Sequence, residues 1–308
     1  RKFTAWLGRA TVYVRALLKW LILALVTLQH IYSFVLHIVQ NRSANNPTPA
    51  NVADVYDAET YEKWKRYSAE NGRLGLISTL VSWVMMMVLL CTNVYAAVAS
   101  LFPAGVFMQL LAVLLLHAVV EAVVNAGLNY VSTMIIEEKY GFNRSTMKTF
   151  VTDQIRNFLL ELLLSVGLMW ILSGLHRWLG DGMILLFAGV VFCITLLISF
   201  LYPIFSRIGN KFVPLEDGEL KDKLTALLTK HNYTVRAIEV MDASRRTTKL
   251  NAYFTGFGKL KTIVLYDNLV NAMSTEEICS VFAHELGHGL YKDVLKQQIM
   301  NFGNLLIT

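Results

Sequence analysis

The chain has 308 residues, of which 55% are hydrophobic and only 16% are charged, and its mean hydropathy is +0.47. A water-soluble domain carries about a quarter charged residues, so this composition excludes an ordinary soluble globular protein. The formal net charge of +6 comes from Lys and Arg that are spread along loops and never alternate with aromatic residues, which favours basic loops beside a membrane over nucleic-acid binding.

Apolar stretches dominate residues 1–205, and five of them are long enough to cross a bilayer, which takes about 20 residues. They run from 17 to 39, 74 to 98, 106 to 131, 155 to 175 and 183 to 201. We therefore expect 1–205 to form five membrane spans with cytosolic loops. Residues 299–308 predict the start of a sixth span, and the Arg at position 1 and the apolar last residues suggest a fragment that is cut within that span.

Among the loops that join the five spans, the basic residues lie mainly in two, between spans one and two and between spans three and four. The positive-inside rule places these loops in the cytosol, so the segment that follows span five also lies there. The basic residues before span one disagree with this orientation. Either the N-terminus overrides the rule, or Arg15 and Lys19 extend their charged ends to the membrane surface.

The polar segment 206–298 predicts a compact cytosolic domain with a metalloprotease helix at its end. The apolar spacing favours a helix at 219–230 and strands at 237–241, 251–254 and 262–266. Ser274 and Glu277 have the spacing of a capping box, so a helix begins there and continues through His284 and His288.

The run His284-Glu-Leu-Gly-His288 is the strongest chemical signal in the chain. Residues i and i+4 share a helix face, so both imidazoles can bind one Zn²⁺ ion. Glu285 points beside the metal, where it can take a proton from an activated water and return it to the leaving amine. The flanks Val281, Phe282 and Ala283 are apolar, so we expect a buried helix on which these polar groups need a ligand.

A catalytic zinc usually has three protein ligands, and this chain supplies only two of them in the motif. Beyond His288 there is no His or Glu, and Asp293 is about 500° around the helix from His288, so it should not face the metal. We expect the third ligand after Thr308, so the fragment itself should be close to inactive. The three cysteines are too far apart to form a cysteine zinc site.

Several motifs together resemble the integral-membrane CAAX prenyl proteases, the type I CAAX endopeptidases. The resemblance covers about residues 50–300. It is carried by segments 57–63, 136–143, 214–221, 244–248, 251–257, 263–267 and 283–288. Those at 244–248, 251–257 and 263–267 correspond to the family's strands before the zinc helix. Gly289 departs from the family, which has an aromatic residue there, and Asp293 stands where a further His is common.

The resemblance implies an all-α multi-span membrane protein, a helical barrel around a chamber, with a small α+β cytosolic zinc-protease domain. It implies removal of the last three residues from prenylated CAAX proteins in the endoplasmic reticulum membrane, with the active site facing the cytosol. Substrate would add as a strand along Asn251, Ala252, Tyr253 and Phe254, although core packing alone could also explain that strand. We expect a monomer with Zn²⁺ as its cofactor.

Two other functions fit part of the pattern. A membrane quality-control zinc protease would share the metal motif but would have fewer spans and would lack the run 137–143. A non-catalytic membrane scaffold with a vestigial metal site would lack stoichiometric zinc and chelator-sensitive activity.

Overall fold

The computed structural model describes residues 2–43, 46, 57–103, 105–256 and 261–307, and these divide into two compact units, 1–140 and 141–308. The first unit is helical. Its elements are α1 (Lys2–Ser43), α2 (Ala58–Cys91), α3 (Val94–Ser100), α4 (Val106–Tyr130) and the π-helix η2 (Val131–Glu137). Of the predicted linker Asn46–Pro49, only Asn46 is among the described residues.

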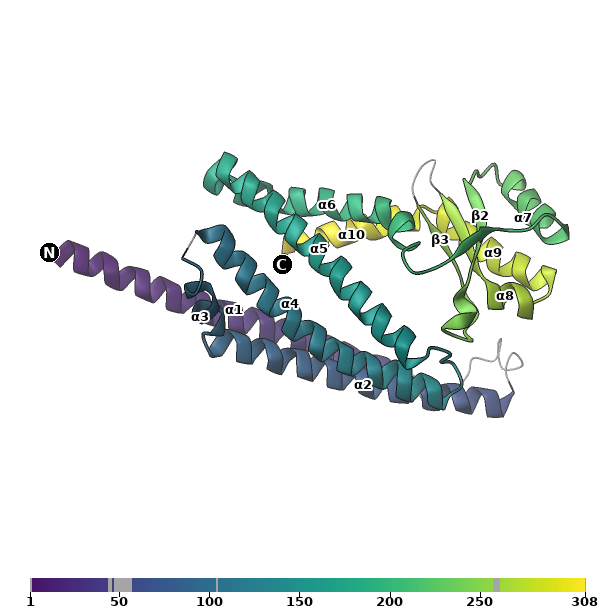
Figure 1. The fold of residues 1–308 in the computed structure, drawn as a ribbon, viewed down its shortest axis with the longest axis horizontal. Coiled ribbons are helices and arrows are strands. Elements are labelled where there is room, and N and C mark those ends of the chain that lie inside the picture. The colour runs from purple at the N-terminus through teal and green to yellow at the C-terminus, as the bar shows by residue number, and fades with distance from the viewer. Residues whose placement is uncertain (1, 44–45, 47–56, 104, 257–260, 308) are drawn as a thin grey trace. The chain divides into compact units, whose positions relative to one another are not determined.

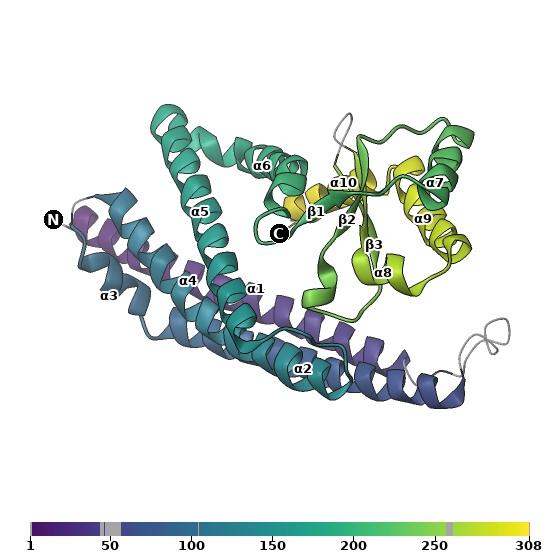
Figure 2. The same cartoon turned by 45° about the vertical axis from the view of Figure 1, so that its right-hand side comes forward.

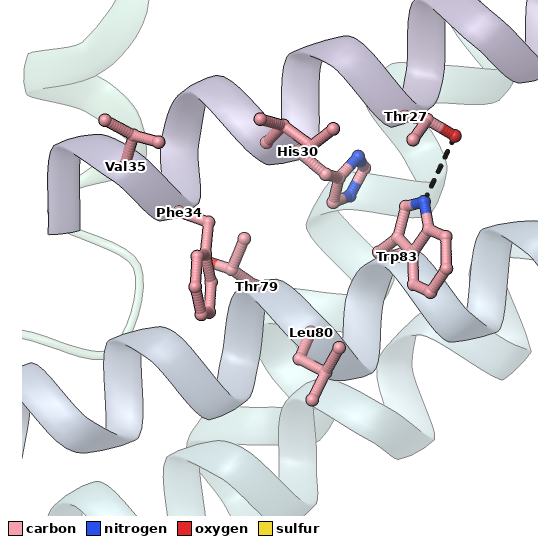
Figure 3. A pocket seen from close by; sticks show the side chains of 8 residues that line it. Thr27, His30, Phe34, Val35, Thr79, Leu80 and Trp83 are labelled. Carbon is pink, nitrogen blue, oxygen red and sulfur yellow. Dashed lines mark hydrogen bonds between the residues drawn. The ribbon is translucent and has the colours of Figure 1, made fainter. Parts of the chain in front are cut away.

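Helix α1 lies along α2 in the first unit (Figures 1 and 2). An apolar groove of about 330 Å³ opens between the two helices, and Figure 3 shows the side chains that line it. The Trp83 indole donates a hydrogen bond of 3.2 Å to Thr27 Oγ1 across this groove. The Nδ1 atom of His30 lies 2.8 Å from the carbonyl of Val26 in its own helix.

The second predicted span is interrupted in the structure. Residues 74–98 were expected to form one helix, but α2 ends at Cys91 and α3 begins at Val94. The Thr92 hydroxyl bonds to the carbonyl of Val88, and Asn93 adopts a left-handed φ of 57°. Asn tolerates that conformation better than most residues, so the backbone turns there.

The second unit carries two long helices and the sheet domain. Its helices are α5 (Met147–Leu179), η3 (Gly180–Gly182), α6 (Met183–Phe205), α7 (Glu219–Lys230), η4 (Ala243–Arg245), α8 (Asp267–Ala272), α9 (Thr275–Leu290) and α10 (Asp293–Ile307). Its strands are β1 (Phe212–Pro214), β2 (Ala237–Met241), β3 (Ala252–Thr255) and β4 (Thr262–Tyr266).

Four helices in the described residues are long and apolar enough to cross a membrane: Ala16–Ser43, Ala58–Cys91, Val106–Glu137 and Met147–Leu179. They correspond to the first four predicted spans. The fifth predicted span lies in α6, whose described part contains a shorter apolar helix at Gly189–Ser199. The predicted start of a sixth span lies in α10, which packs against α6 through Phe192 and Phe302, with ring centroids 4.4 Å apart. The predicted domain boundaries at 205 and 298 stay predictions.

The sheet has the order β1-β2-β4-β3, with β2 and β4 parallel and both outer strands antiparallel. Strand β4 is central and almost wholly buried, which explains its apolar sequence. The helices α7, α8 and α9 pack on the sheet around one core. That core is formed by Leu215, Leu224, Leu228, Ala252, Ile263, Leu265, Leu269, Ile278, Phe282 and Leu286. The prediction of a multi-span helical protein with a small α+β domain is confirmed.

The segment 244–248 was expected to be a strand, and this is wrong. It forms the short helix η4 and a loop, because its polar groups bond elsewhere. The backbone N–H and hydroxyl of Ser244 donate to the Asp267 carboxylate, and Thr248 N–H donates to the Phe142 carbonyl at 3.0 Å. Thr247 also forms an isolated bridge with Asn143. Residues 142–143 and 247–248 are therefore held together by backbone hydrogen bonds.

Candidate active site

Helix α9 carries the metal motif, and its start is fixed by side-chain capping. Ser274 accepts from the Glu277 backbone N–H, and the Glu277 carboxylate accepts from the Ser274 backbone N–H at 2.8 Å, so the predicted capping box is confirmed. The Ser274 backbone N–H and then the Ser274 hydroxyl donate to the Glu277 carboxylate and hold the pKa of Glu277 below its ordinary value of 4.5. Lys223 on α7 pairs with Glu219 at 2.7 Å and with Glu276 at 2.6 Å, and the contact with Glu219 and then that with Glu276 raise the pKa of Lys223.

One face of α9 fills the domain core and the opposite face carries the motif. Ile278, Phe282 and Leu286, spaced four residues apart, are at most 2% exposed. His284 and His288 lie on the other side and are exposed in the described structure, with Glu285 half-buried. The expected burial of this helix holds for Phe282 and Leu286 but not for the two histidines, because the buried apolar residues occupy a single stripe.

The two histidines converge on one point. Their Nε2 atoms lie 3.2 Å apart, and the rings are nearly perpendicular. Two ligands that each lie about 2.0–2.1 Å from a tetrahedral Zn²⁺ ion would be separated by about 3.3 Å. With a Glu285 carboxylate oxygen, the ligand atoms all lie within 4.8 Å of one another. Among the described residues this is the one cluster of three His, Cys, Asp or Glu side chains that could hold a metal. The donor set fits zinc.

Asp293 contacts the second histidine of the metal motif. Its Oδ2 lies 2.9 Å from His288 Nδ1, the ring nitrogen on the side away from His284. Helix α9 ends at Leu290 and α10 begins at Asp293, so the chain turns between the two residues. Such a carboxylate fixes which imidazole nitrogen carries the proton and leaves Nε2 free to bind a metal. Sequence reasoning placed Asp293 away from the metal but missed this contact.

Strand β3 lies beside α9 (Figures 1 and 2) and forms an edge of the sheet. Of the residues proposed to bind substrate, Asn251 is exposed, Ala252 is buried, and Tyr253 and Phe254 are half-buried. Phe254 and His288 line the same cavity, so the structure brings this strand and the metal motif together. Phe257 in the same motif lies outside the described residues.

Three further residues near the motif were not singled out from the sequence. Tyr233, Lys261 and Lys292 line the cavity with His288 and Phe254. They come from the loop after α7, the segment before β4 and the turn after α9. No periodicity or spacing marks such positions, because only the tertiary fold brings them to one place.

Two family profiles match the chain. One, described as CAAX prenyl protease N-terminal, five membrane helices, matches residues 37–207, and the other, peptidase family M48, matches residues 214–308. A CAAX prenyl protease 1 homolog of Oryza sativa subsp. japonica is 31% identical over 280 residues, which is 87% of this chain and 66% of that protein. The CAAX prenyl protease 1 of Saccharomyces cerevisiae is 29% identical over 83% of this chain and 60% of its own length.

The fold is also similar to a solved structure. The crystal structure of S. mikatae Ste24p superposes with a TM-score of 0.82 at 27% sequence identity, covering 94% of this chain and 70% of that one. The chain thus spans about two thirds of the length of these relatives.

Proposed function

This chain belongs to peptidase family M48, in its CAAX prenyl protease branch, and from that premise we propose that the protein is a zinc endopeptidase. Its substrates would be prenylated CAAX proteins, from which it would remove the three C-terminal residues. The observation that carries the proposal is the convergence of His284 Nε2 and His288 Nε2 at 3.2 Å, with the Glu285 carboxylate beside them.

Each residue of the motif has a defined task in peptide hydrolysis. His284 and His288 would hold Zn²⁺, which when bound acidifies water and polarises a carbonyl. Glu285 would accept the proton of the attacking water and then donate it to the nitrogen of the scissile amide. Asp293 would keep His288 in the tautomer that has a free Nε2 lone pair.

The edge strand β3 supports the proposal that substrate binds by strand addition. The Tyr266 N–H donates to the Asn251 carbonyl, which identifies these two residues as a hydrogen-bonded pair of the antiparallel ladder. Pair types alternate along such a ladder, so the backbone groups of Ala252 and Phe254 point away from β4. Phe254 is the more accessible of the two and lines the cavity beside His288. The buried Ala252 side chain packs in the core, which also fits the simpler interpretation of this strand.

The membrane setting follows from the fold. Four described helices could cross a bilayer, so the protein is a membrane protein. We further propose that it resides in the endoplasmic reticulum membrane as a monomer, with 206–298 in the cytosol. The basic loops on one side of the spans support the cytosolic placement of 206–298.

Cleavage of a synthetic farnesylated CAAX peptide by the purified full-length protein tests the proposal. Mass spectrometry should detect the intact C-terminal tripeptide, a zinc chelator should stop its release, and added Zn²⁺ should restore it. Cleavage at another bond, or release that the chelator leaves unchanged, would contradict the proposal. Equal cleavage of unprenylated, misfolded membrane proteins would instead indicate a quality-control protease.

A further inference from the structure

The segment that precedes the edge strand β3 is held from the side of α8. The Tyr266 N–H donates to the Asn251 carbonyl at 3.0 Å, at the residue where β4 ends. The chain then turns into α8, and the next donor is a side chain. Asn268 Nδ2 donates to the Lys249 carbonyl at 2.8 Å and to the Thr247 carbonyl at 3.1 Å. Asn268 thus continues the ladder of β4 past the end of that strand.

The opposite side of the same segment is also bound. The Thr248 N–H donates to the Phe142 carbonyl, and the Thr248 hydroxyl donates to the Gly141 carbonyl, both at 3.0 Å. Thr247 pairs with Asn143 in an isolated antiparallel bridge. The backbone of this segment is therefore fixed from two directions.

The Asn268 side chain suits this place, although half of its amide is left unpaired. An amide nitrogen donates two hydrogen bonds, whereas a Ser or Thr hydroxyl donates one and a carboxylate donates none. The Oδ1 atom of Asn268 is buried and has no hydrogen-bond partner among the described residues. Because a buried acceptor without a partner is unfavourable, local stability alone does not explain an amide here. What distinguishes Asn268 is its pair of donors.

The segment is important because it leads directly into the strand that is proposed to bind substrate. β3 is four residues long, and in the described sheet it pairs with β4 alone. The backbone groups of Ala252 and Phe254 point away from β4, and an added strand would pair with them. A strand that adds in either direction uses these same groups. Since hydrogen bonds need good alignment, a small rotation of β3 would weaken all of them together.

We propose that Asn268 is a positioning residue for substrate binding. By holding the carbonyls of Thr247 and Lys249, Asn268 aligns β3, and this alignment lets the outward backbone groups of β3 pair with the substrate backbone. The inference rests on the proposed function and deepens it. Asn268 lies on α8, whereas the metal motif lies on α9. Its loss should therefore weaken binding of the substrate backbone and leave the zinc site unchanged.

Binding of a dansylated, farnesylated CAAX peptide to the full-length protein tests this role. The parent protein carries Glu285→Ala, so that the peptide is not consumed, and a series of peptides carries one backbone N-methyl group at each residue in turn. In the parent we expect N-methylation to raise the Kd about tenfold at one or more positions, because the methyl group removes a strand hydrogen bond. Adding Asn268→Ala should raise the Kd of the unmethylated peptide about tenfold, and N-methylation should then change it by less than about twofold.

Three more variants separate positioning from general structure. Asn268→Ser keeps one donor and should give intermediate values, and Asn268→Asp, which has no donor, should behave like Asn268→Ala. Asn271→Ala, at an exposed position of the same helix, should bind every peptide like the parent. The zinc content should be the same in all of them, and if Asn268→Ala does not retain zinc, Asn268→Ser decides by the same criteria. An unchanged Kd, or an N-methyl sensitivity equal to that of the parent, would overturn the assignment.

Turnover by the protein with Glu285 intact distinguishes this role from the proposed function. Asn268→Ala should raise KM for the farnesylated CAAX peptide about tenfold and change kcat by less than about twofold, as for a loss of binding that leaves the chemical step intact. Absence of CAAX cleavage by the wild type would contradict the proposed function, whatever the binding measurements show. Normal cleavage without any coupling between Asn268 and N-methylation would contradict only the positioning role.

Discussion

His288 Nδ1 and Asp293 Oδ2 lie 2.9 Å apart across the turn that joins α9 to α10. Hydrogen bonds from His288 and then from Lys296 hold the pKa of Asp293 below its ordinary value of 3.8, so the carboxylate is charged at neutral pH. The metal motif therefore depends on a residue outside its own helix. Asp293, the first residue of α10, determines the orientation of the His288 ring.

Replacing Asp293 by Ala should weaken zinc binding by about 10- to 100-fold, because His288 loses the group that orients its ring. Asp293→Asn should have a smaller effect, since an amide oxygen can still accept from Nδ1–H. Competition against a zinc indicator measures both. Asp222→Asn, on an exposed part of α7, is the control, and an unchanged affinity in Asp293→Ala would mean that the contact does not support the metal.

Arg246 should be important for stability, because its guanidinium forms two hydrogen bonds with Asp153, at 2.7 and 3.0 Å. Both side chains are 21% exposed. Arg246→Ala should cost about 2 kcal/mol, because the partly buried Asp153 carboxylate loses both hydrogen bonds from this guanidinium and keeps only its pair with Arg156. Arg245→Ala should cost under about 1 kcal/mol, because its pair with Asp242 is more exposed. Equal thermal midpoints for the two variants would contradict this difference.

The capping box predicts a specific pH dependence. The pKa of Glu277 is lower in the folded state than its ordinary value of 4.5, so its charged form stabilises the fold. That contribution is complete above about pH 4.5 and is lost as the pH falls through the folded-state pKa. The wild type should therefore melt at a higher temperature than Glu277→Gln at neutral pH, and the two midpoints should approach each other as the pH falls through the folded-state pKa of Glu277. A constant difference would mean that charge is not the cause.

Gly289 and Gly287 in the same helix should respond differently to Ala. At Gly289 the new Cβ meets Tyr233 and Phe254, so Gly289→Ala should destabilise by about 1–3 kcal/mol, the usual cost of overpacking. At Gly287 nothing described lies within 4 Å of the new Cβ, and the better helix former should be neutral or stabilising by up to about 1 kcal/mol. Tyr233→Ala should relieve part of the first effect, and strict additivity of the two changes would contradict the clash.

Much of the fold follows from short-range patterns in the sequence. The helix at 219–230 and the strands at 237–241 and 262–266 have the predicted bounds, because apolar periodicity alone determines which face is buried. Strand β1 was missed, since three residues that end in Pro214 have no readable period. The break at Thr92–Asn93 was missed because apolar residues continue on both sides of it.

The candidate site, like the fold, could be predicted only in part from the sequence. The spacing of His284 and His288 brings two imidazoles together on any helix, so the sequence suffices for that pair. Asp293 was placed by assuming one continuous helix, whereas the positive φ of Lys292 reverses the chain and brings the carboxylate to His288. Tyr233, Lys261 and Lys292 meet only through the sheet, which no local pattern predicts.

The most direct test of the account is the Glu285→Ala variant of the full-length protein, with zinc content and cleavage measured on the same preparation. The variant should retain the zinc of the wild type, because both histidines are intact. Its cleavage of a farnesylated CAAX peptide should fall by about 100- to 10,000-fold, the usual contribution of a general base. Glu276→Ala, in the first turn of the same helix, should cleave like the wild type. Undiminished turnover by Glu285→Ala would contradict the assignment of this helix as the active site.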